Sequence, residues 1–267
     1  MSRTSPPRRR YGYDTRFWGE TAKAATERQS YWSATRRPIP CLAFVGPLLL
    51  IYELGVLWLG GSSAEALRTG ADGWMRHVLA RLGVTDQWFL PLSLVLVLVA
   101  WQVVQRQDWR FPLSTPVGMV LESLVLGVAL VGLSRLVDVG FSALEHSRGH
   151  VLALSPVSAR LIGFVGAGVY EEALFRLILI PLLFALLRVL QTPAVLASTA
   201  AMTVSALLFS LAHHAGTPGE AFTWFAFIFR WLAGVYFAWV FMARGFGIAV
   251  GTHTAYDMLV GWLGWHL

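Results

Sequence analysis

The sequence contains few charged residues and a single cysteine. Charged residues make up 13% of its 267 residues and apolar residues 56%, whereas about a quarter of a soluble globular domain is charged. Cys41 alone cannot form an internal disulfide, and one cysteine excludes a cysteine-rich metal site. These shortages argue against a soluble or disulfide-stabilised domain.

The sequence instead contains long runs of apolar residues. Several of them reach the roughly 20 residues that cross a bilayer. The sequence therefore predicts an all-α, polytopic transmembrane helical bundle of about seven spans. We expect these spans at residues 41–60, 88–105, 116–137, 158–188, 194–214, 221–243 and 246–265. The fourth is long enough to bend near Pro181.

A shorter segment, residues 73–84, places apolar and basic residues at helical spacing. This pattern is typical of a helix that lies in the membrane interface. An ordinary helix in a loop explains the same spacing, so the sequence leaves both interpretations open.

Positive charge is concentrated before the first span. Residues 1–40 hold nine Lys/Arg and three Asp/Glu, a balance of +6 that equals the net charge of the chain. Such a segment indicates a cytoplasmic N-terminus and attracts anionic lipid rather than nucleic acid. We therefore divide the chain into a basic cytoplasmic or interfacial arm, residues 1–40, and a transmembrane bundle, residues 41–267. The expected location is a bacterial or archaeal cytoplasmic membrane.

Four ionisable side chains interrupt the later spans: Glu171, Glu172, Arg176 and Asp257. Each costs about 2.5–3.5 kcal/mol at the centre of a membrane helix, so together they would cost on the order of 10 kcal/mol if none were paired. Such residues mark a functional site by default. Glu53 and Glu122 also lie within spans, but no motif surrounds them.

Helical spacing separates the roles of the two adjacent glutamates. Glu172 and Arg176 are four residues apart, so they share a helix face and can form an ion pair. Glu171 is rotated by about 100° from Glu172, which leaves it available to a reacting group. A structural charge cluster that holds helices together is the alternative interpretation of all three.

Two further spans carry histidines at the same spacing. Phe209 and His213 are four residues apart, and so are His253 and Asp257. Imidazole and carboxylate groups suit either zinc coordination or the activation of water. A lone intramembrane histidine more often makes a hydrogen bond between helices, and His214 is rotated away from His213.

Three short motifs together resemble a known family. "EEALFR" is similar to Glu-Glu-x-x-x-Arg, "FSLAH" to Phe-x-x-x-His, and "HTAYD" to His-x-x-x-Asn/Asp. In this order on successive membrane helices they resemble the CAAX protease and bacteriocin-processing family of intramembrane endopeptidases, which includes the Ras-converting CAAX endopeptidases. The resemblance covers about residues 158–262 and leaves out the first three spans.

The resemblance implies a membrane-embedded protease in which water attacks a peptide bond of a membrane-anchored or lipidated substrate. Carried over by position, Glu171 activates the water and His213 assists it. His253 and Asp257 complete the site, by stabilising the oxyanion or by binding a metal. Glu172 and Arg176 support the site and Phe209 packs against the cavity wall. Many relatives have Asn in the place of Asp257.

Cofactor use stays open at this point. Glu171, His213, His253 and Asp257 are possible zinc ligands, and a metal-free glutamate mechanism uses the same residues. A non-catalytic bacteriocin-immunity or scaffold protein is the alternative function, and a transporter is a weaker one because no internal repeat is visible. Simple alternation of the spans also places His213 and His253 at different depths, unless one helix sits deeper or residues 214–220 are re-entrant.

Overall fold

The computed structural model describes residues 31–142, 157–215 and 221–262, and within them the chain forms helices and no strand. The helices, with two irregular segments η1 and η2, are α2 (Pro38–Gly60), η1 (Gly61–Leu67), α3 (Gly70–Arg81), α4 (Phe89–Gln105), α5 (Ser114–Ser142), α6 (Val157–Glu172), η2 (Ala173–Leu179), α7 (Ile180–Val189), α8 (Ala194–Ala212), α9 (Trp224–Arg244) and α10 (Phe246–Trp262). Most of the basic arm, the 216–220 turn and the end of the last predicted span lie outside the described residues.

The predicted all-α membrane bundle is confirmed, but the count of about seven spans is not exact. Each predicted span contains a helix. Among the described residues, four helices are long and apolar enough to cross a membrane: α2, α5, α8 and α9. At 17 residues, α4 and α10 are shorter. The fourth predicted span consists of three consecutive segments, α6, η2 and α7.

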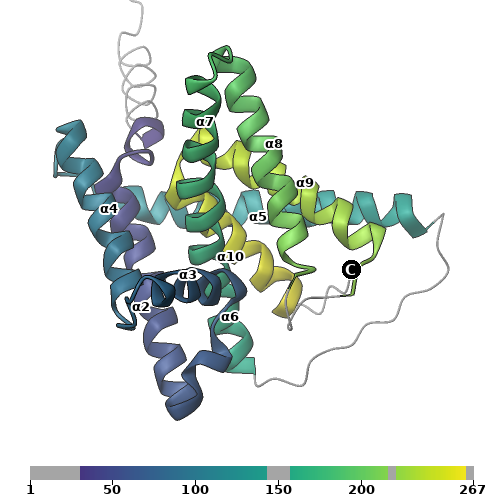
Figure 1. The fold of residues 1–267 in the computed structure, drawn as a ribbon, viewed down its shortest axis with the longest axis horizontal. Helices are drawn as coiled ribbons and strands as arrows, with labels where there is room; N and C mark the ends of the chain where they lie inside the picture. The colour runs from purple at the N-terminus through teal and green to yellow at the C-terminus, as the bar shows by residue number, and fades with distance from the viewer. Residues whose placement is uncertain (1–30, 143–156, 216–220, 263–267) are drawn as a thin grey trace, which may run out of the picture.

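Helix α10 occupies the middle of the bundle. It packs against α5, α6, α9 and α2, while α8 packs against α7 and α9 (Figure 1). All of its first eleven residues are buried. A helix enclosed on so many sides is a suitable carrier for polar side chains that must be kept from lipid.

Small residues allow this close packing. In a membrane, helices associate through van der Waals contact and backbone approach rather than through the hydrophobic effect. A Cβ added at Gly168 of α6 would lie 2.1 Å from Thr254 Oγ1 and 3.0 Å from Val250 O of α10. Glycine at this position therefore sets the distance between the two helices.

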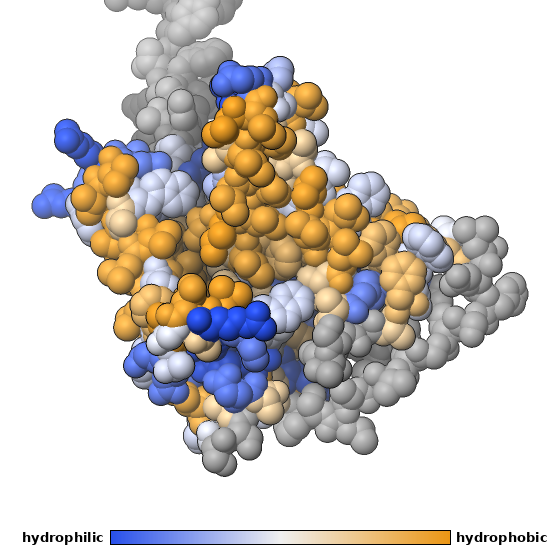
Figure 2. Space-filling view, in the orientation of Figure 1, coloured by the Kyte–Doolittle hydropathy of each residue, from blue (hydrophilic) through white to orange (hydrophobic). Residues whose placement is uncertain are grey.

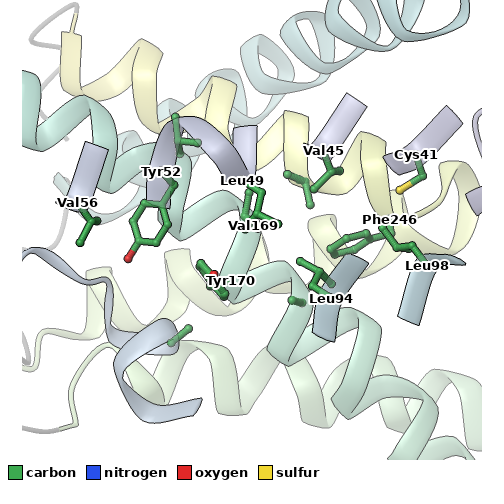
Figure 3. Packing of buried hydrophobic residues seen from close by; sticks show 14 residues of the cluster. Cys41, Val45, Leu49, Tyr52, Val56, Leu94, Leu98, Val169, Tyr170 and Phe246 are labelled. Atoms are coloured by element: carbon green, nitrogen blue, oxygen red, sulfur yellow. The ribbon is translucent and has the colours of Figure 1, made fainter. Parts of the chain in front are cut away.

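The apolar side chains divide between an inner cluster and an outer, lipid-compatible face. Val45 and Leu49 of α2 pack with Val169 of α6 and Phe246 of α10 (Figure 3). On the outside, the visible surface over α7, α8 and α4 is largely hydrophobic, whereas hydrophilic residues gather around α3 (Figure 2). This distribution fits a protein surrounded by lipid.

Helix α3 corresponds to the segment predicted to lie in the interface. It crosses the direction of α2 and α4 (Figure 1). Trp74, Val78 and Leu82 are exposed on one side, whereas Asp72 is completely buried on the other. An exposed apolar face on a helix that runs across the spans favours the interfacial interpretation.

Glu122, for which the sequence offered no role, ties the start of the described chain to the bundle. It lies on α5 and makes a bidentate ion pair with Arg244 at the end of α9. Tyr31 also donates to its carboxylate at 2.7 Å. The guanidinium of Arg244 lies 3.5 Å from the centre of the Trp32 ring. The residues before α2 are thus held by a structural ion pair.

Candidate active site

The residues predicted to form the site come from three separate stretches of the chain. Glu171 is the penultimate residue of α6, His213 follows the last residue of α8, and His253 and Asp257 lie on α10. The structure brings the four side chains together around the carboxylate of Glu171.

Glu171 is placed between the two imidazoles. Its Oε2 atom lies 3.8 Å from Nε2 of His213 and 3.8 Å from Nε2 of His253. The side chain keeps 13% of its surface exposed. Oε2 makes no hydrogen bond to any described residue. One carboxylate oxygen therefore faces both histidines while keeping its hydrogen-bonding capacity.

His213 is held in one tautomer by the backbone of its own helix. Its Nδ1 lies 2.9 Å from the carbonyl oxygen of Phe209. In the neutral ring Nδ1–H donates to that carbonyl, so Nε2 carries the lone pair that faces Glu171. Nε2 can then accept a proton or a hydrogen bond.

His253 is fixed from two directions. Its Nδ1 lies 2.8 Å from Oε1 of Glu172, so Nδ1–H donates to that carboxylate. Its ring stacks on Phe237 of α9, with centroids 4.5 Å apart and planes inclined by 13°. These contacts aim Nε2 toward Glu171 and toward Asp257, whose Oδ2 lies 3.6 Å away.

The predicted ion pair between Glu172 and Arg176 is present and completely buried. Arg176 Nη1 lies 3.2 Å from Glu172 Oε1, and both side chains are fully shielded. The guanidinium sits 4.4 Å from the centre of the Phe209 ring and donates to the carbonyl of Gly234 at 3.2 Å. Glu172 therefore connects Arg176 to His253, which is a supporting position.

Phe209 packs within the site rather than at its edge. Its ring meets the rings of His213 and His253 edge-on, at centroid distances of 4.8 and 5.9 Å. It also contacts Phe175 at 5.4 Å. One aromatic side chain thus fixes both imidazoles and the arginine beside them.

The helix changes its winding directly after the two glutamates. Residues 173–179 form the π-helical segment η2, and Arg176 lies within it. Segments of this kind occur frequently at functional sites. The sequence predicted a bend near Pro181; the irregularity instead begins eight residues earlier, and Pro181 sits in the first turn of α7, where proline is tolerated.

The expected mismatch in depth does not arise. Helix α8 ends beside the middle of the continuous rod formed by α6, η2 and α7, so His213 reaches Glu171 (Figure 1). Residues 216–220 of the turn lie outside the described part of the chain.

Sequence reasoning missed two features of the site. Phe237 stacks on His253, but one aromatic among many in an apolar span gives no signal. Tyr170, beside Glu171, donates to Glu53 of α2. Glu53 inside the first predicted span indicated that some contact exists there, but local spacing could not identify its partners because they lie elsewhere in the chain.

A metal was one of the two interpretations of this site, and imidazoles with carboxylates are chemically suitable ligands for zinc. Within the described residues, no three or more His, Cys, Asp or Glu side chains are arranged so that they could hold one ion. Metal dependence therefore stays a prediction.

Comparison with known proteins agrees with the motifs. Residues 153–259 match the family model described as type II CAAX prenyl endopeptidase Rce1-like, and this range contains every predicted site residue. No curated protein and no solved structure gives a significant match. Residues 153–259 are therefore similar to type II CAAX prenyl endopeptidases, in agreement with the family that the three motifs resemble.

Proposed function

We propose that the protein hydrolyses a peptide bond of a membrane-anchored protein near its terminus, with Glu171 as the general base. The observation that carries the proposal is the position of Glu171 Oε2, which lies 3.8 Å from Nε2 of both His213 and His253. A carboxylate with two imidazoles at this distance is suited to bind and deprotonate one water molecule.

In the proposed reaction, water binds between Glu171 and His213, whose Nε2 accepts a hydrogen bond from it. Glu171 removes one proton from the water as the oxygen attacks the carbonyl carbon of the scissile bond. The carbonyl π electrons move to the oxygen, which becomes an oxyanion. Glu171 then gives the proton to the amide nitrogen as the C–N bond breaks, which yields a carboxylic acid and an amine.

His253 is placed to stabilise the oxyanion. With both ring nitrogens protonated, Nδ1–H donates to Glu172 at 2.8 Å and Nε2–H remains for the substrate oxygen. Asp257, 3.6 Å from the same Nε2, supports this charged form of the ring. The pair between Glu172 and Arg176 keeps the imidazole in position from behind.

The substrate class follows from the setting of the site. The groups lie within a bundle whose outer face is apolar, so a substrate attached to the membrane arrives with its scissile bond near this depth. The matching family model names CAAX prenyl endopeptidases. We therefore propose a lipidated protein as substrate and a single-span membrane protein as the alternative.

A cleavage assay in proteoliposomes tests the proposal. Wild type, Glu171→Gln and His213→Ala are incubated with a farnesylated CAAX peptide and with a peptide that carries one membrane-spanning helix. We expect each variant to lose about a hundredfold or more in kcat. His77→Ala, on the exposed side of α3, is the matched control and should cleave at the wild-type rate.

The outcomes separate the alternatives. Equal cleavage by wild type, Glu171→Gln and His213→Ala would show that the site is wrongly assigned. No cleavage of either peptide by the wild type would favour the non-catalytic interpretation. A chelator arm with metal analysis of the purified protein addresses zinc: a metal-free glutamate mechanism predicts full activity after chelation and no stoichiometric zinc.

A further inference from the structure

A second buried ionic cluster lies against another face of α6, and all of its residues lie outside the family match over residues 153–259. Arg68 Nη1 is 3.2 Å from Glu53 Oε2 and 2.8 Å from Asp72 Oδ2. Arg76 Nε is 2.6 Å from Asp72 Oδ1, and its Nη2 is 3.2 Å from Glu53 Oε1. Tyr52 donates to Asp72 at 2.8 Å. We call these five residues the α2–α3 cluster.

The charges of the α2–α3 cluster balance. Two carboxylates meet two guanidinium groups, and the side chains of Glu53, Arg68 and Asp72 are at most 3% exposed. Burial alone would lower the pKa of Arg68, but its hydrogen bond to Asp72 and the nearby negative charges raise it overall. Loss of any one of these four groups would leave an uncompensated buried charge, which is strongly destabilising. The cluster therefore fixes α3 to α2.

Tyr170 connects α6 to the cluster. Its hydroxyl donates to Glu53, and its ring meets Tyr52 edge-on, with centroids 5.3 Å apart (Figure 3). One turn earlier, Gly166 makes room for Tyr52, because a Cβ there would lie 2.0 Å from Tyr52 Cε2. Tyr170 itself is 1% exposed. The α6 backbone is thus held at a defined rotation against α2.

The contact between Tyr170 and Glu53 lies next to the active site in the sequence. Tyr170 immediately precedes Glu171, and the two side chains diverge by about 100° around the helix. Directly after Glu172 the regular winding gives way to η2. Because the helix is irregular on the C-terminal side of Glu172, the direction of the Glu171 side chain depends on the contacts that fix the preceding residues of α6.

We propose that the hydrogen bond from Tyr170 to Glu53 positions the Glu171 carboxylate between the two histidines, so that Tyr170 and Glu53 are positioning residues. The proposal rests on the proposed function for its kinetic consequence. The α2–α3 cluster acts as the fixed base, and the pair of Glu172 with Arg176 holds the other side of the same turn.

The decisive variant is Tyr170→Phe. It keeps the ring against Tyr52 and removes only the hydroxyl, while Glu53 retains both arginines. Tyr236→Phe is the matched control, because Tyr236 donates at 2.9 Å to the carbonyl of Leu126 and joins α9 to α5 away from Tyr170. We expect kcat of Tyr170→Phe to fall between about tenfold and a hundredfold with KM unchanged. The control should change neither constant.

Histidine NMR provides a readout that does not depend on turnover. In protein labelled with 15N-histidine, the signals of His213 and His253 are assigned from His→Gln variants, and Glu171→Gln gives the response to loss of the carboxylate. Tyr170→Phe should move both signals in the same direction as Glu171→Gln, whereas Tyr236→Phe should leave them in place.

Wild-type histidine signals together with wild-type kcat in Tyr170→Phe would overturn the proposal. So would a kcat loss matched in Tyr236→Phe, since that would reflect a general loss of packing. If wild-type protein cleaves neither peptide, the proposed function fails, and the histidine spectra of Tyr170→Phe still decide whether the hydroxyl positions Glu171.

Discussion

Arg176 is the side chain whose placement would cost most if its partners were absent. It is completely buried within a membrane bundle, and its charge is met by Glu172 at 3.2 Å. Three aromatic rings, Phe175, Phe209 and Phe237, lie 4.4–5.9 Å from its guanidinium carbon. Ion pairing and cation–π contact together keep this charge in apolar surroundings.

Replacing Arg176 by methionine should therefore destabilise the protein strongly. Arg176→Met leaves the buried carboxylate of Glu172 with His253 as its remaining partner, and removal of one partner of a buried pair costs about 3–5 kcal/mol. Denaturant titration of the protein in detergent micelles measures the free energy of unfolding. The double variant Glu172→Gln/Arg176→Met should recover part of the loss, because it also removes the carboxylate charge that Arg176 neutralised.

Arg188→Met is the control for this experiment. Arg188 lies at the end of α7, where its side chain donates to the carbonyl of Thr192 at 2.7 Å in an exposed position. Its loss should cost at most about 1 kcal/mol. Equal unfolding free energies for Arg176→Met and Arg188→Met would contradict a stabilising role for the buried pair.

For individual residues, local spacing in the sequence predicts contacts within one helix but not contacts between helices. The i, i+4 rule gave the pair of Glu172 with Arg176, because both ends lie on one helix. The same rule cannot find Tyr170 with Glu53, which are 117 residues apart. The stacking of Phe237 on His253 is equally hidden, since it depends on how α9 and α10 cross.

The contact between α6 and α10 decides whether the site can close. Gly168 lies one helical turn before Glu172 on α6. It faces Val250 and Thr254 of α10, and Thr254 directly follows His253. Any side chain at Gly168 would push the helices apart and lengthen the 2.8 Å contact between Glu172 and His253. Packing at this position is thus linked directly to the geometry of the site.

Two glycine substitutions on α6 test this link, because we expect them to change the free energy of unfolding in opposite directions. Gly168→Ala should destabilise the protein by about 1–3 kcal/mol and lower its activity, because the methyl group overpacks the interface. Gly163→Ala, with nothing within 4 Å of the added Cβ, should be neutral or stabilising by up to about 1 kcal/mol. Unfolding in detergent measures both. A Gly168→Ala variant as stable and active as Gly163→Ala would refute the close contact.

Helices differ in how well their features could be predicted. Hydropathy located them well, since α4 coincides with the predicted 88–105 within a residue and α8 with 194–214 within two. Apolar runs stop where polar linkers begin, so the ends are visible in the sequence. The π-helical winding of η2 is not visible, because a change of backbone hydrogen bonds from i+4 to i+5 over a few residues leaves their hydropathy unchanged.

For the whole molecule, the contacts divide the helix ends into two groups. Arg37, just before α2, donates to the backbone of Asp108 and Arg110 in the connection between α4 and α5. Arg36 donates to the carbonyl of Ala243 near the end of α9. These segments therefore lie at one side of the bundle, together with the described residues 31–37 that precede α2.

The opposite side carries η1 and α3, and two of the three arginines of residues 61–81 form ion pairs there. Arg68 and Arg76 are paired with Glu53 and Asp72 inside the α2–α3 cluster. The excess of positive charge, +6, falls in residues 1–40, and Arg36 and Arg37 of that segment lie at the other side. Because an excess of Lys and Arg near the first span favours the cytoplasmic side, we predict that the connection between α4 and α5 faces the cytoplasm and the α3 side faces outward.

Cysteine labelling tests this orientation, because Cys41 is the sole cysteine and is only 4% exposed. In a Cys41→Ala background, Thr85→Cys marks the α3 side and Trp109→Cys the side of the arm, and both positions are exposed. A membrane-impermeant maleimide applied to bacterial spheroplasts should label Thr85→Cys at once and Trp109→Cys only after the membrane is opened. The reverse pattern would show that the basic arm does not set the orientation, and labelling of both from outside would mean that the two connections do not lie on opposite faces of the bundle.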